Sequence, residues 1–324
     1  MKESWFCRDY EKGDEHKILS LFADVFKREM SLAFWKWRFI KNPFGKGIIK
    51  VLFDGDRLIG HYAVIPMNLQ VKGELVKAVF SMTTMTHPDY GGQGIFIYLA
   101  EDTYKLCHQR GYHFVYGFPN KNSYYGFTYK LGWRDFGTMT ALKKKLQSRA
   151  STTSIAKATK QIEYFDDTIN SLWDKVKQDY TIITPRTEKF MNWRFGENPD
   201  TDYTKCIVFD NNGDILGYVV LKVYAKGDVI KGHIVDMLSM PDREVVKSLL
   251  EYSYRYFLER GIYDISCWMP ENYFYSDILQ EEGFVRKETE TYFGVRVFSE
   301  GNALAKSAEQ ISDWFITMAD SDAF

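Results

Sequence analysis

Hydrophobic and polar positions follow two periods along the chain, and together they predict an α+β fold. Apolar residues recur every three or four positions in EHKILSLFADVF and from Ile95 to about His108, which predicts amphipathic helices. Apolar runs flank turns such as Asp54-Gly55-Asp56, and glycine there supplies the positive φ that a hairpin needs. We therefore expect a mixed, mostly antiparallel central sheet flanked by helices.

The same pattern occurs twice. WRFIKNPFGKGIIKVLFDGDRLIGHYAV begins at Trp37, and WRFGENPDTDYTKCIVFDNNGDILGYVVL begins at Trp193, an offset of about 156 residues. Further along, FSMTTMTHPD corresponds to VDMLSMPD, and QRGYHFVYGFPN corresponds to ERGIYDISCWMPEN. Matches in the same order over such a length indicate an internal duplication, and so two tandem domains of one fold.

The duplication and the local composition set the expected boundaries. The segment QSRASTTSIAKATK is rich in Ser, Thr, Ala and Lys and has no hydrophobic period, which is typical of a linker. We expect an N-terminal domain at 1–146, the linker at 147–160, a C-terminal domain at 161–299 and a tail at 300–324.

Composition limits the kinds of molecule that the protein is expected to bind. The 42 Lys and Arg residues balance 43 Asp and Glu residues, which argues against a protein that coats nucleic acid through its phosphates. The four cysteines are far apart and form no CxxC pair, so no metal site is expected. The N-terminus has no apolar signal region and no apolar run is long enough to span a membrane, so we expect a cytoplasmic protein.

The two repeats differ most at one loop. The first has Tyr90, Gly91, Gly92, Gln93 and Gly94 before a predicted helix, whereas the second has Pro241-Asp242-Arg243-Glu244 there. Glycines before a helix let backbone N–H groups converge on an anion such as a pyrophosphate. Acidic side chains would repel one, so only the first repeat is predicted to bind it. The alternative is that the glycines only form a tight turn.

In its context this loop resembles the Gcn5-related N-acetyltransferase (GNAT) superfamily. The resemblance rests on HPDYGGQGIFIYLAEDTYKLCHQRGY followed by a strand and PNKNSYYGFTYKLGW, and it covers nearly the whole chain as a tandem pair. In that family a Q/R-x-x-G-x-G/A loop holds the acetyl-CoA pyrophosphate, and the strand before it pairs with the pantetheine. Gly92 and Gly94 match family glycines. Gly91 replaces the usual Gln or Arg, and Phe96 replaces a small residue and is expected to crowd the phosphates.

The resemblance implies a set of acetyl-CoA-binding residues on the strand, the loop and the following helices. They are Thr84, Met85, Thr86, Gly91, Gly92, Gln93, Gly94, Ile95, Phe96 and Asn122. For Asn122, as for Asn120, the alternative is a helix cap near Ser123.

A tyrosine of the family often protonates the departing thiolate, but Thr128 stands at its position. Tyr124 and Tyr125 are expected on the same helical face as Thr128, with Tyr129 about 100° round. We predict Tyr125 as the general acid, because the pKa of tyrosine (about 10) is near that of a thiol (about 8.5). The alternative for Tyr125 is an aromatic that only packs.

Two further features have two interpretations each. The carboxylate of Phe324 would be the base if the chain works like tandem acetyltransferases of the enhanced intracellular survival type; otherwise the tail acids Asp320 and Asp322 are solvated with it. Arg38 and Arg194 of the Trp-Arg-Phe copies would bind anions, or would pack on aromatics and bond backbone carbonyls. Because both copies keep the arginine, the second interpretation is favoured.

These inferences predict an enzyme, an acyltransferase that moves an acetyl group from acetyl-CoA to an amine of a small molecule, such as an amino sugar. We expect no metal, nucleic acid or membrane partner. One alternative is a non-catalytic binding or scaffold protein on the same fold. The other is an aminoacyl-tRNA-dependent transferase, which would need a basic surface that the balanced charge disfavours.

Overall fold

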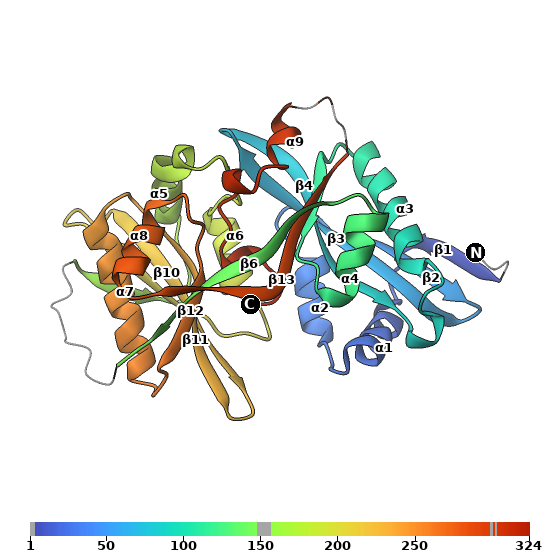
Figure 1. Cartoon of the computed structure of the whole chain (residues 1–324), viewed down its shortest axis with the longest axis horizontal. Helices are drawn as coiled ribbons and strands as arrows, with labels where there is room; N and C mark the ends of the chain where they lie inside the picture. Colours follow the sequence, from blue (N-terminus) through green and yellow to red (C-terminus); the bar gives the residue numbers. More distant parts are fainter. Residues whose placement is uncertain (1–3, 148–156, 299–300, 302) are drawn as a thin grey trace. The chain divides into compact units, whose positions relative to one another are not determined.

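A computed structural model describes residues 4–147, 157–298, 301 and 303–324. The chain forms two compact units, each built from strands and helices (Figure 1). Unit 1 comprises Met1–Gly137 and Glu290–Ile311, and unit 2 comprises Thr138–Thr289 and Ser312–Phe324. No helix among the described residues has the length and apolar character to cross a membrane.

The sheet of unit 1 follows the order β1-β2-β3-β4-β5-β13. Its strands are β1 (Trp5–Asp9), β2 (Ile48–Asp54), β3 (Arg57–Val71), β4 (Glu74–Thr86), β5 (Phe114–Gly117) and β13 (Val285–Val297). Neighbouring strands are antiparallel except β4 and β5, which are parallel. The predicted mixed, mostly antiparallel sheet is therefore confirmed.

Helices cover both faces of this sheet. They are α1 (Glu15–Phe26), α2 (Leu32–Phe39), the 3-10 turn η1 (Pro88–Tyr90), α3 (Ile95–Gln109), α4 (Lys121–Tyr125), the π-helical turn η2 (Gly126–Lys130) and α9 (Ala303–Ser307). Successive strand residues point to opposite faces. His61 of β3 meets Phe39 of α2, while Tyr62 meets Phe96 of α3, so these two helices lie on opposite faces.

Helix α3 begins where its apolar period predicts and packs its buried face on β3. Its residues Ile95 and Leu99 join Ile59 and Tyr62 in the main core of unit 1. Gly60 permits this close approach, because a Cβ there would lie 3.0 Å from Leu99 Cδ1 and would overlap Ile95. The helix thus starts directly over the sheet, beside the end of β4.

Unit 2 repeats this plan, with the sheet order β6-β12-β11-β10-β9-β7. The strands in this order are β6 (Arg134–Lys145), β7 (Thr159–Ile162), β9 (Thr204–Phe209), β10 (Ile215–Lys226), β11 (Val229–Ser239) and β12 (Asp264–Trp268). The short strand β8 (Ile182–Ile183) is not part of it. Its helices and turns are α5 (Thr168–Val176), η3 (Lys177–Asp179), α6 (Glu188–Phe195), α7 (Arg243–Leu258), α8 (Phe274–Glu281), η4 (Ile311–Asp313) and η5 (Met318–Asp320). Within this strand order β11 and β12 are parallel, as β4 and β5 are in unit 1.

The repeats correspond element by element, but their last strands are exchanged. Strand β6 follows the helices of the first repeat and pairs with β12, from Ala141 to Lys145. Strand β13 follows the helices of the second repeat and pairs with β5, from Gly294 to Val297. The compact units therefore change at 137/138 and 289/290, whereas the boundaries expected from the repeat are later in the chain.

The expected linker at 147–160 lies partly outside the described residues, which omit 148–156. Its end is not a linker in the structure, because β7 begins at Thr159 and pairs with β9. Residues 299, 300 and 302, at the start of the expected tail, also lie outside the described part.

A network of charged side chains is buried in unit 2. Arg186 is fully buried, and its Nε lies 3.0 Å from Asp236 Oδ2 on β11. Its Nη1 lies 2.9 Å from Asp320 Oδ1 in the tail. Thr317 and Tyr218 donate hydroxyl hydrogen bonds to the Asp236 carboxylate, at 2.8 and 2.7 Å. The tail turn η5 is thereby fixed to β11.

This network corrects one expectation about the tail. Asp320 was expected to be solvated, but it is buried, while Asp322 is exposed as expected. Burial alone would raise the pKa of Asp320, yet that pKa is lowered because Arg186 favours the charged carboxylate. The last part of the tail, Ser312–Phe324, belongs to unit 2, and Asp320 is buried there.

Candidate functional site

The glycine-rich loop between β4 and α3 has the backbone that its sequence predicts. Gly92 and Gly94 have φ values of +73° and +78°, a region that L side chains rarely adopt. A Cβ on either would meet nothing within 4 Å, so backbone conformation and not space requires glycine here. The loop is open in front of α3.

The N-terminus of α3 presents donors to this loop. The N-cap residue is Gly94, and no side chain caps the helix. The first N–H groups of a helix have no partner within it, and they lie at the positive end of its dipole. Loop and helix together are a site suited to an anion.

The corresponding helix of unit 2 differs at this point. The Asp242 side chain accepts from Glu244 N at 2.8 Å, so a carboxylate of the chain itself caps α7. Lys157 pairs with the same carboxylate at 3.3 Å. In the second repeat the helix donor is thus already engaged by an acidic side chain.

Strand β4 opens away from β5 just before the loop. The parallel pairs between them end at Ser81↔Gly117, while β4 continues to Thr86. Among the described residues, Thr84, Met85 and Thr86 follow the last of these pairs, and Met85 and Thr86 still pair with β3. Beyond Ser81, no described strand pairs with the edge of β4 that faces away from β3.

A bend in β4 accompanies this opening. The register with β3 shifts between His61 and Ala63, and Thr83 of β4 has φ +53°. His61 is fully buried, and its Nδ1 lies 2.8 Å from the carbonyl oxygen of Thr83. Burial lowers the pKa of His61 to about 4.

Lowering the pH is expected to destabilise the protein in part through His61. The unfolded chain takes up the proton near pH 6.5, and the folded chain only near pH 4. The contribution of His61 to stability is therefore complete above pH 6.5 and is lost as the pH falls to 4, by about 3 kcal/mol. Urea unfolding of wild type and His61→Asn at about pH 7 and about pH 4.5 measures it. An identical pH dependence of the two proteins would contradict the prediction.

Phe96 does not occupy the loop, contrary to its expected crowding of the phosphates. Its ring packs against Phe127 at 4.8 Å and Tyr62 at 6.0 Å between centroids. A Cβ on Gly126 would overlap the Phe96 ring, so that glycine lets the segment after α4 approach α3. The Phe96 side chain therefore packs against the core, while its backbone belongs to the first turn of α3.

The three candidate tyrosines lie on or beside a π-helical turn. Tyr124 donates to Asp135 Oδ2 at 2.5 Å, and this hydrogen bond is the main reason that its pKa is raised to about 12. Tyr125 and Tyr129 are 59% and 66% exposed, with ring centroids 5.2 Å apart. An ordinary helix would turn Tyr129 away, but the wider π turn brings its ring to 6.4 Å from Tyr124.

The two asparagines at the start of α4 differ in what their side chains do. Asn120 is the helix cap, and its Oδ1 accepts from the backbone N–H of Asn122 at 2.9 Å. Ser123 completes the capping box. Asn122 has an exposed side chain in the first turn, so a role in cofactor binding stays a prediction.

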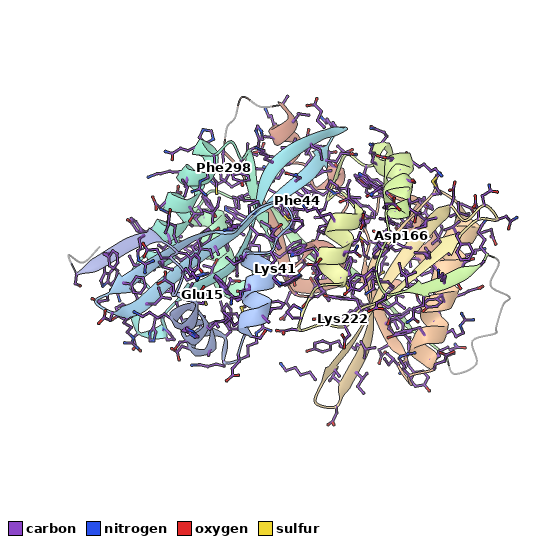
Figure 2. All side chains as sticks on the ribbon, turned by 180° about the vertical axis from the view of Figure 1, so that it is seen from behind. Glu15, Lys41, Phe44, Asp166, Lys222 and Phe298 are labelled. Atoms are coloured by element: carbon purple, nitrogen blue, oxygen red, sulfur yellow. The ribbon has the colours of Figure 1, made fainter. Side chains whose placement is uncertain are left out.

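A cavity of about 1000 Å³ lies in unit 1 beside α3. It is lined by Glu101, Lys130, Leu131, Gly132, Trp133, Arg134, Val295, Arg296, Val297, Phe298, Lys306 and Glu309. Phe298, which follows β13, is labelled in Figure 2. Arg296 pairs with Glu101 at 2.7 Å. Within the described part of the chain, no ion pair involves Lys130, Arg134 or Lys306, so the cavity favours an anionic ligand.

The Trp-Arg-Phe copies are core, as favoured. In unit 2 the guanidinium of Arg194 donates to the carbonyl oxygen of Ala319 at 3.0 Å and to the main-chain oxygen of the last residue, Phe324, at 2.5 Å. In unit 1 the guanidinium of Arg38 lies 4.6 Å from the centre of the Phe34 ring.

Phe324 lies in unit 2. Its oxygen also accepts from Tyr203 at 3.0 Å, and its ring packs against His233 and Trp268. Its role as a base stays a prediction. The described residues hold no group of three His, Cys, Asp or Glu side chains placed to bind a metal.

This chain is similar to known proteins, over part of its sequence to one family model and over most of its length to several solved structures. Residues 7–135 match the family model described as the acetyltransferase (GNAT) domain. A GCN5-related N-acetyltransferase from Anabaena variabilis is similar over 91% of this chain and 73% of its own, with 14% identity and a TM-score of 0.71. A probable N-acyltransferase from Enterococcus faecalis is similar over 91% and 72%, with 11% identity and a TM-score of 0.69.

A third structure, Saccharomyces cerevisiae N-myristoyltransferase with bound myristoyl-CoA, is similar over 92% of this chain and 79% of its own. The identity is 12% and the TM-score 0.63. At such identities the likeness establishes the fold alone. No curated protein matches the chain.

Proposed function

We propose that the chain, whose residues 7–135 match the acetyltransferase (GNAT) domain, transfers an acyl group from acyl-CoA, first of all acetyl-CoA, to an amine of a small molecule. The observation that carries the proposal is the open glycine loop and uncapped start of α3, next to the free edge of β4. The loop suits the pyrophosphate, and the strand edge suits the extended pantetheine. The proposed residues are those that the resemblance implies: Thr84, Met85, Thr86, Gly91, Gly92, Gln93, Gly94, Ile95, Phe96 and Asn122.

The cavity beside α3 supports an anionic nucleotide ligand. Its volume of about 1000 Å³ is sufficient for a drug-sized molecule. Lys130, Arg134 and Lys306 supply positive charge, and Trp133 supplies an aromatic wall. An acyl-CoA has such a nucleotide at one end and an apolar acyl chain at the other. The length of the acyl chain that this protein transfers is a question for the binding experiment below.

The proposed reaction is a direct transfer. The amine nitrogen attacks the thioester carbonyl carbon, the C–S bond breaks, the amine loses a proton to a base, and the thiolate takes up a proton. Binding both reactants together lowers the barrier by roughly 7–11 kcal/mol. Phe324 remains one candidate for the base, and an amino sugar remains the first candidate acceptor.

Tyr125 is the proposed donor to the thiolate. Tyr125 has an exposed side chain, whereas Tyr124 already donates to Asp135 and has its pKa raised to about 12. A proton donor works best when its pKa is close to that of the leaving group. Tyr129, whose ring lies beside Tyr125, is the second candidate.

Tyr125→Phe is expected to lower kcat by about 100-fold, because general acid catalysis typically contributes roughly 10²–10⁴-fold. Acyl-CoA affinity is expected to change by less than about threefold, since the ring remains. Single-turnover and steady-state assays with a reactive amine measure both quantities. Tyr164→Phe, at a comparably exposed tyrosine of unit 2, is the matched control, and Tyr129→Phe tests the second candidate. Unchanged turnover in Tyr125→Phe would remove this residue from the mechanism.

Calorimetry with coenzyme A, acetyl-CoA and longer acyl-CoAs tests the proposal itself. We expect heat of binding with coenzyme A, and thiol release in an amine panel that includes amino sugars. A stronger response to long-chain acyl-CoA would replace acetyl by that chain. No heat with coenzyme A would overturn the proposal in favour of a scaffold protein.

A further inference from the structure

We propose that His61 is a positioning residue for this reaction: through Thr83 it holds the bend of β4 that presents the strand edge to the thioester. The inference rests on the proposed function. It starts from a hydrogen bond between His61 Nδ1 and the carbonyl oxygen of Thr83, 2.8 Å long and fully buried on the His61 side.

The hydrogen bond determines the tautomer of His61. A carbonyl oxygen only accepts, so the proton is on Nδ1, and Nε2 carries a lone pair. Nε2 is buried and has no partner among the described residues. An unpaired buried polar atom costs about 1–3 kcal/mol, which an apolar side chain would avoid. A histidine at this position therefore indicates that its donor to Thr83 is needed.

The hydrogen bond from His61 is needed because of the backbone conformation of Thr83. This residue is β-branched and has φ +53°, a conformation that costs roughly 1–3 kcal/mol and persists only where the surroundings impose it. Two residues of β4, Thr83 and Thr84, stand opposite Tyr62 alone, because Ala63 pairs with Met82 and His61 with Met85. Such bulges bend a strand and change the direction of its peptide groups.

The bend lies where the site requires it. The parallel pairs with β5 end at Ser81, two residues before Thr83, and the residues proposed to meet the ligand chain begin at Thr84. Without the donor from His61, Thr83 is expected to relax towards ordinary extended backbone. The peptide groups from Thr84 onward would then move relative to the glycine loop, which binds the other end of the ligand.

The decisive variants are His61→Leu and His61→Asn. Leucine fills the site without a donor, whereas the amide nitrogen of asparagine takes the place of Nδ1. We expect His61→Leu to lower kcat by roughly 10- to 100-fold, as misplaced reacting groups do, with coenzyme A affinity within about threefold of wild type. His61→Asn is expected to keep kcat within about threefold. Backbone amide exchange at Thr84 and Met85 is expected to accelerate in the leucine variant only.

A merely structural role predicts another result. Val64→Ala, a fully buried change on the same strand, serves as the control for loss of stability. If Val64→Ala lowers kcat as much as His61→Leu, or if His61→Asn is as impaired as His61→Leu, the proposal is wrong. If wild type binds no coenzyme A, the proposed function fails first. Amide exchange then still decides whether His61 holds the bend.

Discussion

Gly94→Glu is expected to abolish the rise in melting temperature that acetyl-CoA gives to the wild-type protein. Gly94 has φ +78° and immediately precedes α3, so a glutamate there strains the loop and places a negative charge where we propose the pyrophosphate. Like charges brought together in a site cost several kcal/mol, which weakens binding by about 100-fold or more. Thermal melts with and without millimolar acetyl-CoA measure the shift.

Gly111→Glu is the matched control for this prediction. Gly111 follows the opposite end of α3, has φ +79°, and a Cβ there also meets nothing within 4 Å. The two substitutions therefore impose similar backbone strain and the same charge change. We expect Gly111→Glu to be destabilised but to keep the full acetyl-CoA shift. Loss of the shift in both variants, or in neither, would contradict the assignment of the loop.

Arg186→Met is expected to lower the free energy of unfolding by about 3–5 kcal/mol, the usual effect of removing one partner of a buried ion pair. Asp236 and Asp320 both accept from this guanidinium, and all three side chains are buried. Without the arginine, two buried carboxylates lose the cation that they share. Urea unfolding followed by circular dichroism measures the loss.

Arg243→Met supplies the comparison, because Arg243 forms an exposed ion pair with Glu281. Such pairs contribute about 0–1 kcal/mol. A loss for Arg186→Met as small as that for Arg243→Met would mean that the buried network does not hold the tail. A loss confined to Arg186→Met would confirm that the tail turn contributes to the stability of unit 2.

The sequence predicted the parts of the fold that depend on local pattern. The start of α3 at Ile95 follows from its apolar period, and the cap on α4 follows from Asn120. The loop glycines were predicted from the same physics that the structure displays, a positive φ that side chains disfavour. The duplication was visible because both copies keep one order of motifs.

Other features depend on contacts between distant residues. Nothing near Asp320 in the sequence indicates that Arg186 and Asp236 surround it, so a run of tail acids was interpreted as solvated. The position of Tyr129 depends on a π turn, which forms where Phe127 and Leu131 are drawn into the core. Thr83 gives no sign of its positive φ, since a threonine in a strand pattern predicts ordinary extended backbone.

The exchange of β6 and β13 also constrains how such a gene can change. Each repeat, cut out of the present chain at the point where the repeat starts again, would lack the strand that now pairs with its β5 or β12. With these strands exchanged, each repeat depends on the other for one strand. Deleting one repeat would therefore remove a strand from the sheet of the other. The second repeat lacks the glycine loop, but it supplies β13, which pairs with β5 of the first repeat. That pairing is a reason for the chain to keep the second repeat.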